Sequence, residues 1–286
     1  MEGWYSMKVD KKNASMDDRL LETLLSNAQT MRRLSLDMTL GSGMTGAHLG
    51  GGLSMIEIMD VLYTAVLRVK PDDPLWPERD RFILSKGHGT LAYYTALYCR
   101  GFVTLEELMT FKHNHTFLYG HPYYNPEKGI EFTSGSLGLG VSLGVGSALA
   151  AKRRGLDYRV FVVVGDGESN EGTIWEAAMS AAHYKLDNLF VIVDANGLQY
   201  DGCTDCVMDM GDIQRKWEAF GWQAVSVDGH DVQQLYRALT FRGDRPKAIV
   251  ARTVKGKGVS FMENNALWHH SRLTQQQYDT AIAELR

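Results

Sequence analysis

The chain has 286 residues, of which 44% are hydrophobic and 22% are charged, and its formal net charge at pH 7 is −4. These values are ordinary for a soluble globular protein and give no indication of nucleic-acid binding or of attachment to an anionic membrane surface. The length allows one large α/β domain or two small domains.

The three cysteines are too few for a disulfide scaffold, and they favour a reducing cytoplasm as the location. Cys203-x-x-Cys206 has the spacing of a redox or zinc pair, but the sequence contains no second pair of metal-binding cysteines. We therefore interpret this spacing as incidental.

The amino-terminal half begins with residues 1–16, which we interpret as a mobile or loosely attached tail. Asp17 and Asp18 follow, and acidic residues favour a helix N-terminus, so a helix is predicted from there to Met38. Ser54, at the end of a glycine-rich loop, is predicted to cap the next helix. The further elements predicted in this half are a helix at 55–69, a strand at 81–85 and a helix from 89 to 98.

The segment 132–151 carries no charge and therefore needs to be compared with a membrane span. Its five glycines and several serines lower its hydrophobicity well below that of a spanning helix, so we predict a closely packed internal helix. The N-terminus also lacks the apolar stretch of a signal peptide. A soluble protein is expected.

The second half contains two uninterrupted runs of β-branched and aromatic residues, 160–164 and 189–193, as buried parallel strands require. A helix is predicted between them, at 173–185. Further strands are predicted at 224–227 and 248–251, with helices at 212–220 and 232–241. Alternating strands and helices predict an α/β fold with an open, mostly parallel sheet and helices on both faces, which binds ligands at the carboxyl ends of the strands.

Polar loops follow both apolar runs. Gly165-Asp166-Gly167-Glu168 comes after the first and Asp194-Ala195-Asn196-Gly197 after the second, so both loops are expected at the same edge of the sheet. Glycines allow close approach of a ligand, and free amides at a helix start bind phosphate. The carboxylate of Asp166 and the amide oxygen of Asn196 are hard ligands that suit Mg²⁺ or Ca²⁺ rather than Zn²⁺.

The stretches 165–178 and 186–202 closely resemble transketolases, and Asp166 with Asn196 matches the family's thiamine diphosphate fingerprint. The resemblance extends over nearly the whole chain after about residue 20. Four histidine motifs occur in the family's order: Gly46-Ala47-His48, Lys86-Gly87-His88, Gly120-His121-Pro122 and Trp268-His269. Residues 17–286 are accordingly expected to form a single domain that binds the diphosphate of the cofactor.

The resemblance implies a role for each matched residue. The metal, Mg²⁺ or alternatively Ca²⁺ or Mn²⁺, would be held by Asp166, Asn196 and the main-chain carbonyl of Leu198. The cofactor-binding set would be His88, Gly135, Ser136, Leu137, Gly167, Glu168, Asn196, Lys255 and His269. The residues facing the sugar and transferring protons would be His48, His121 and His269. Glu171 and Glu176 would be buried acids linking two cofactor sites across a dimer interface.

Two departures from the family pattern affect the substrate side. The family often has Trp-His-Gly-Lys where this chain has Trp268-His269-His270-Ser271, which leaves open whether His269 or His270 points inward. Leu139 stands where a polar residue is common. The other histidines, His113, His115, His183 and His230, are interpreted as structural.

In the family the aminopyrimidine ring of the cofactor binds to a second domain, which also provides an activating glutamate, and this chain has no such motif. We therefore expect the N-terminal subunit of a split transketolase, completed by a separate C-terminal chain, with two copies of each in the assembly. Such an enzyme moves a two-carbon ketol unit from a ketose, expected to be a sugar phosphate, to an aldose. The alternatives are a subunit of a deoxyxylulose-phosphate synthase-like or pyruvate dehydrogenase-like enzyme, or a non-catalytic subunit with the same fold.

Overall fold

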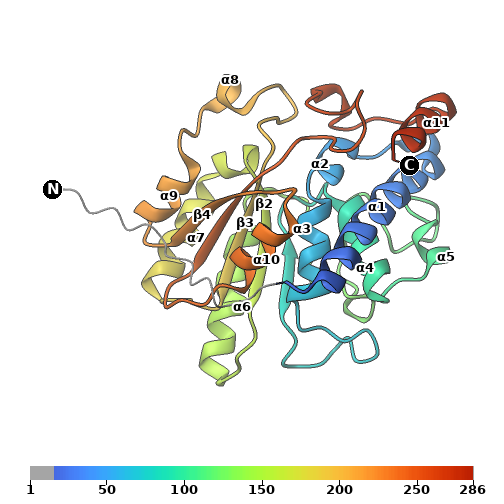
Figure 1. The fold of residues 1–286 in the computed structure, drawn as a ribbon. Helices are drawn as coiled ribbons and strands as arrows, with labels where there is room; N and C mark the ends of the chain where they lie inside the picture. Colours follow the sequence, from blue (N-terminus) through green and yellow to red (C-terminus); the bar gives the residue numbers. More distant parts are fainter. Residues whose placement is uncertain (1–15, 286) are drawn as a thin grey trace.

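A sheet of five parallel strands lies at the centre of the computed structural model, which describes residues 16–285 (Figure 1). The tail expected at 1–16 lies outside these residues except for its last one. The strand order is β1-β2-β3-β5-β4, and every neighbouring pair is parallel. This arrangement confirms the predicted fold class. The strands are β1 (Arg81–Leu84), β2 (Val160–Gly165), β3 (Leu189–Ala195), β4 (Gln223–Asp228) and β5 (Lys247–Arg252).

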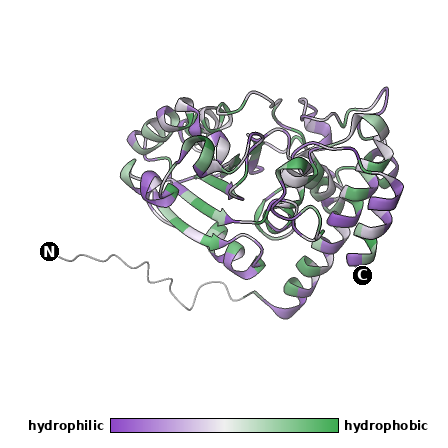
Figure 2. Cartoon of the chain, turned by 90° about the horizontal axis from the view of Figure 1, so that it is seen from above, coloured by the Kyte–Doolittle hydropathy of each residue, from purple (hydrophilic) through white to green (hydrophobic). Residues whose placement is uncertain are grey.

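Helices cover both faces of the sheet, so the central strands are apolar on both sides. Along β2, Phe161 and Val163 belong to one core cluster, while Val160, Val162 and Val164 belong to the other. Seen from above, the strands are mostly hydrophobic and the outer turns of the helices are more polar (Figure 2). Burial on both faces explains why these strands appear in the sequence as continuous runs rather than as an alternating pattern.

The helices fall into two layers, with one short helix beyond the ends of the strands. One layer contains α6 (Gly140–Arg154), α7 (Gly172–His183) and α9 (Ile213–Ala219). The other contains α1 (Asp18–Gly41), α2 (Leu49–Leu53), α3 (Ile56–Asp60), α4 (Thr90–Arg100), α5 (Leu105–Leu108), α10 (Val232–Thr240) and α11 (Gln275–Glu284). The short helix α8 (Thr204–Met208) lies beyond the carboxyl ends of the strands (Figure 1).

The first helix begins where the sequence predicts, because the Asp17 carboxylate accepts a hydrogen bond from the backbone N–H of Leu20 at 2.7 Å. The predicted helix 55–69 is confirmed over residues 56–66, where α3 continues without a break into a π-helical segment at Val61–Val66. The glycine-rich segment before it, predicted as a loop, contains the short helix α2. Ser54 does not cap α3, since its hydroxyl donates to the Asp194 carboxylate at 2.6 Å instead.

The prediction for the uncharged segment 132–151 needs a larger correction. Residues 132–139 are not helical, and α6 begins only at Gly140. One side of α6 packs on the sheet, where a Cβ at Gly144 would lie 2.8 Å from Val162. The opposite side is open, with Leu139 48% exposed and Leu143 42% exposed. The helix is therefore half-buried rather than internal.

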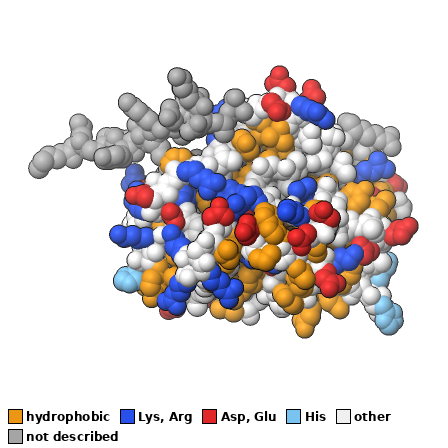
Figure 3. Space-filling view, turned by 90° about the horizontal axis from the view of Figure 1, so that it is seen from below, with side chains coloured by type: hydrophobic (Ala, Val, Ile, Leu, Met, Phe, Trp, Pro, Cys, Tyr) orange, Lys and Arg blue, Asp and Glu red, His pale blue; other side chains and the backbone are white. Residues whose placement is uncertain are grey.

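Among residues 16–285, no helix has both the length and the apolar character needed to cross a membrane. On the face seen from below, acidic, basic and apolar side chains are interspersed (Figure 3).

Candidate active site

The two predicted polar loops meet at the carboxyl edge of the sheet, since Gly165 at the end of β2 lies in register with Asp194 near the end of β3. A cavity of 540 Å³ opens there. All the predicted site residues except Ser136 line this cavity: His48, His88, His121, Gly135, Leu137, Asp166, Gly167, Glu168, Asn196, Leu198, Lys255 and His269. Ser136 is exposed and is not on the cavity wall.

Asp166 is the buried carboxylate of the predicted metal site. Its oxygens accept hydrogen bonds from the backbone N–H groups of Gly167 at 2.8 Å and Gly197 at 2.6 Å. Burial, with a further contribution from the charge of Asp194, raises the pKa of Asp166 to about 6. Among the described residues, no cationic side chain lies within salt-bridge distance of Asp166, so a bound cation would offset this unfavourable burial.

Asn196 and Leu198 provide two more oxygens beside this carboxylate. The Asn196 amide oxygen accepts from the N–H of Leu198 at 3.1 Å, and the Leu198 carbonyl accepts from the Lys255 ammonium at 2.9 Å. A carboxylate, an amide oxygen and a main-chain carbonyl are a donor set that fits Mg²⁺ with phosphate oxygens completing its coordination.

Behind the metal-site loops lies a buried ion pair that no motif in the sequence indicated. The Asp194 carboxylate is fully buried and binds the ammonium of Lys86, which also donates to the Gly51 carbonyl at 2.9 Å. Asp194 also accepts from the hydroxyls of Ser54 and Thr253 and from the Asn196 amide. Burial opposes its ionisation, but Lys86 and these donors hold the pKa of Asp194 below its usual value. Because the Asn196 amide nitrogen donates to Asp194, the amide oxygen of Asn196 points away from Asp194.

Glu168 lies on the cavity wall, but its carboxylate oxygens are occupied by the protein itself. They accept from the backbone N–H groups of Gly138 at 2.8 Å and Gly165 at 2.9 Å, and from the hydroxyl of Ser85. Glu168 therefore joins the loop that carries Gly135 and Leu137 to the end of β2. Such internal bonding indicates a positioning role for Glu168 more than the direct cofactor contact predicted from the sequence.

Five histidine rings surround the cavity mouth, with His48 in the middle. The centroid of the His48 ring lies 5.3 Å from that of His88, 5.7 Å from His121, 5.5 Å from His269 and 4.5 Å from His270. Burial is the largest cause that lowers their pKa values, to about 3 for His48 and to about 4 for His269. The inner imidazoles are therefore neutral at physiological pH, and each has one ring nitrogen that can accept a hydrogen bond.

The geometry distinguishes the two adjacent histidines that the sequence left unresolved. His269 lines the cavity, and its Nδ1 lies 3.1 Å from the Lys255 ammonium. His270 is exposed and packs against the outer side of His48. Outside the cavity, His230 is bonded to Glu57 and to the N–H of Val254, in agreement with a structural role.

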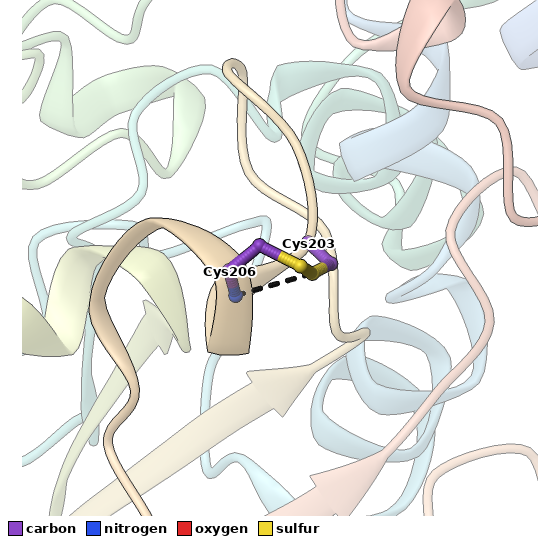
Figure 4. The surroundings of a disulfide bond; sticks show 2 residues. All are labelled: Cys203 and Cys206. Atoms are coloured by element: carbon purple, nitrogen blue, oxygen red, sulfur yellow. Dashed lines mark hydrogen bonds between the residues drawn. A yellow bond between two sulfur atoms is a disulfide. The ribbon is translucent and has the colours of Figure 1, made fainter.

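Cys203 and Cys206 form a disulfide in the loop that follows Leu198, so the interpretation of their spacing as incidental is wrong (Figure 4). Cys203 occupies the N-cap position of α8, and its sulfur accepts from the N–H of Cys206 at 3.1 Å. One helical turn therefore brings the two side chains together. The same loop is tied to the metal site by an antiparallel bridge between Leu198 and Cys203.

The parallel sheet and the polar cavity at its carboxyl edge define the class of the protein as an open α/β domain with a ligand site at the strand ends. The family model described as "Transketolase, thiamine diphosphate binding domain" matches residues 25–285. The chain thus belongs to the transketolase family and comprises its thiamine diphosphate-binding domain.

Two groups of relatives differ in length. The chain is 42% identical to one of the subunits of the apulose-4-phosphate transketolase of Phocaeicola vulgatus, covering 83% of this chain and 85% of the relative. It is 40% identical to the SqwG subunit of the 6-deoxy-6-sulfo-D-fructose transketolase of a Clostridium species, covering 92% and 96%. By contrast, it spans 43% of the Campylobacter jejuni transketolase structure, with 94% of this chain covered, 29% identity and a TM-score of 0.86.

Proposed function

We propose that this chain is the N-terminal, cofactor-binding subunit of a split transketolase, which transfers a two-carbon ketol unit from a ketose to an aldose. The observation that carries the proposal is that the predicted cofactor and substrate residues converge on one cavity. Its match over nearly the full length of relatives named as subunits supports the split organisation.

In this proposal the metal ion, Mg²⁺, binds to Asp166, Asn196 and the carbonyl of Leu198. His88, Gly167, Lys255 and His269 hold the diphosphate, since imidazole N–H groups and an ammonium donate hydrogen bonds to phosphate oxygens and the glycine allows close approach of the backbone. When bound, thiamine diphosphate supplies the carbon nucleophile that cleaves the ketose.

The chain's own contribution to the reaction is made by the histidines at the mouth. In this proposal His48, His121 and His269 take protons from the sugar hydroxyls and return them. Glu168 and the Lys86–Asp194 pair hold the surrounding loops in place.

A C-terminal partner subunit would supply the pyrimidine-binding domain and its activating glutamate, with two copies of each chain in the assembly. Glu171 and Glu176 are exposed in the single chain, and in the proposed assembly they lie at the dimer interface. The ketoses in the names of the two subunit relatives carry a phosphate or a sulfo group. We propose a similarly anionic sugar as substrate, and a cytoplasmic location, where the reducing environment would hold Cys203 and Cys206 as thiols.

The proposal is tested by calorimetry of the purified chain with thiamine diphosphate and Mg²⁺, alone and mixed with the candidate partner. We expect tight binding in the mixture and a loss of at least about a hundredfold in Asp166→Ala, because this change removes a charged metal ligand. Asp72→Ala, an exposed acid remote from the cavity, serves as the matched control. Binding that is insensitive to Asp166→Ala would refute the site.

A product assay separates the proposed reaction from those of related enzymes with the same cofactor. The mixture should consume a ketose donor in the presence of an aldose. Turnover of pyruvate instead would favour the deoxyxylulose-phosphate synthase-like or pyruvate dehydrogenase-like alternative.

A further inference from the structure

Cys203 and Cys206 have no part in the proposed reaction, although residues on both sides of them line the cavity. We refer to residues 198–208 as the cysteine loop, which runs from Leu198 to the end of α8. The Cα atoms of Cys203 and Cys206 are 5.2 Å apart, and a disulfide joins their side chains (Figure 4). Cys206 is exposed and Cys203 is half-buried, so a dissolved thiol or disulfide can reach this pair.

On its amino-terminal side, the disulfide is connected to the proposed metal site through backbone hydrogen bonds. Leu198 and Cys203 form an antiparallel bridge. Beside this bridge, the N–H of Thr204 donates to the carbonyl of Gly197 at 3.0 Å. The N–H of Gly197 in turn donates to the Asp166 carboxylate at 2.6 Å. The position of Cys203 is therefore coupled to two of the proposed metal ligands, the carbonyl of Leu198 and the carboxylate of Asp166.

On its carboxyl-terminal side, the disulfide supports α8, which contributes to the cavity wall. Val207 and Met208 line the cavity and are 42% and 60% exposed. Of the five residues of α8, only Thr204 is buried, so this helix has few contacts with the rest of the protein. A helix of this length is unstable in water without other support. The link between Cys203 and Cys206 therefore stabilises a part of the wall that packing alone holds weakly.

We infer that Cys203 and Cys206 form a thiol–disulfide exchange site, and that closing the disulfide increases the affinity of the cavity for thiamine diphosphate and Mg²⁺. The effect on affinity rests on the proposed function. In the closed loop, the carbonyl of Leu198 and the side chains of Val207 and Met208 are held in place before the ligand binds. Less conformational freedom is then lost on binding. In a reducing cytoplasm the pair is open, and oxidation closes it.

The exchange uses a small disulfide, R–S–S–R, as the oxidant. The thiolate of the exposed Cys206 attacks one of its sulfur atoms, which forms a mixed disulfide and releases one R–S⁻. The Cys203 thiolate then attacks the sulfur of Cys206, which forms the intramolecular disulfide and releases the second R–S⁻. The cysteine pair is oxidised while R–S–S–R is reduced, and the protons of the two cysteine thiols pass to the two released thiolates. A dithiol reductant reverses the reaction.

The exchange is tested on the purified full-length chain without cofactor, after incubation with dithiothreitol and then with oxidised glutathione. Alkylation in denaturant and peptide mass mapping identify the free thiols. We expect Cys203 and Cys206 to be alkylated after reduction and protected after oxidation, while Cys99 is alkylated in both states. Free thiols that persist in oxidised glutathione, or a stable mixed disulfide with glutathione, would overturn the exchange site.

Calorimetry of the chain mixed with its partner subunit then measures the affinity for thiamine diphosphate in Mg²⁺ buffer, in the oxidised and the reduced state. We expect binding at least about fivefold tighter in the oxidised state. Cys206→Ser should have the affinity of the reduced wild type in both states, and the same partner in each mixture controls for oxidation of the partner. Cys203→Ser, which keeps a hydrogen-bond acceptor at the N-cap of α8, should behave in the same way.

Cys99→Ser, at a partly buried position on α4, is the matched control and should keep the difference between the two states. Equal affinity in the oxidised and reduced wild type, or a difference that persists in Cys206→Ser and Cys203→Ser, would overturn the effect on affinity. Failure of both redox forms to bind the cofactor would refute the proposed function, and the effect on affinity with it. Normal binding without a redox difference would refute the effect on affinity alone.

Discussion

His48 lies among four other imidazole rings on the cavity wall. The proton equilibrium of its imidazole affects the stability of the folded chain. Burial and the neighbouring basic groups lower its pKa from 6.5 to about 3. Below pH 6.5 the unfolded chain binds a proton at this position while the folded chain does not. The folded state is therefore disfavoured progressively as the pH falls, until the pH approaches the folded pKa.

We accordingly predict that the free energy of unfolding decreases between pH 6.5 and about pH 4, and that His48→Gln flattens this part of the profile. The contribution of one histidine is less than about 1.4 kcal/mol per pH unit, which is the limit for a single proton. Urea unfolding monitored by tryptophan fluorescence at several pH values provides the measurement. His183→Gln, at an exposed position, should retain the wild-type slope, and an unchanged slope in His48→Gln would contradict the prediction.

At the level of elements, the strands could be predicted because each depends mainly on its own composition. The apolar runs at 160–164 and 189–193 correspond to β2 and β3 within two residues. The helix predicted at 55–69 forms over 56–66, but its predicted cap does not, because a tertiary contact overrides the local signal. Ser54 turns to Asp194, on a strand far away in the sequence, rather than capping the next helix.

The candidate site shows the same division between local motifs and tertiary partners. The polar loops and histidine motifs were recognisable because each has a compact local signature. The partnership of Lys86 with Asp194 and that of Glu168 with the amide of Gly138 join separate parts of the chain. No spacing rule within a single sequence connects such pairs, so their roles became apparent only in the structure.

The Cys203–Cys206 disulfide closes the loop after Leu198, and we predict that the order of this loop depends on redox conditions. In Cys206→Ser, we expect the backbone amides of residues 198–208 to exchange with solvent roughly fivefold faster, which corresponds to about 1 kcal/mol of local stability. The change should come from the greater conformational freedom of the open loop. Hydrogen exchange measured by mass spectrometry would test it.

Cys99→Ser, at a partly buried position outside this loop, is the control and should leave the exchange of 198–208 unchanged. Treating the wild-type chain with a reductant should reproduce the effect of Cys206→Ser. Equal exchange in the oxidised and reduced chains would show that the hydrogen bonds of the loop are sufficient to order it.

For the whole molecule, the length of the chain relative to its homologues leads to a prediction about activity. The chain spans 43% of human transketolase, but 96% of a relative named as a subunit. The isolated chain should therefore show no ketol transfer above background, and addition of the C-terminal partner should restore it. A coupled assay of ketose consumption would measure this, and substantial turnover by the chain alone, free of any partner, would refute the divided active site.

The bridge between Ala47 and Ser271 joins loops from opposite ends of the domain at the cavity mouth. During synthesis His48 is added long before Ser271. The hydrogen bonds between Ala47 and Ser271 that hold the His48 loop can form only after Ser271 has been added. A nascent chain that has already folded the strands β1 to β5 therefore still lacks a finished pocket. The pocket wall is complete only once His269 and Ser271, which follow β5 in the sequence, have been added.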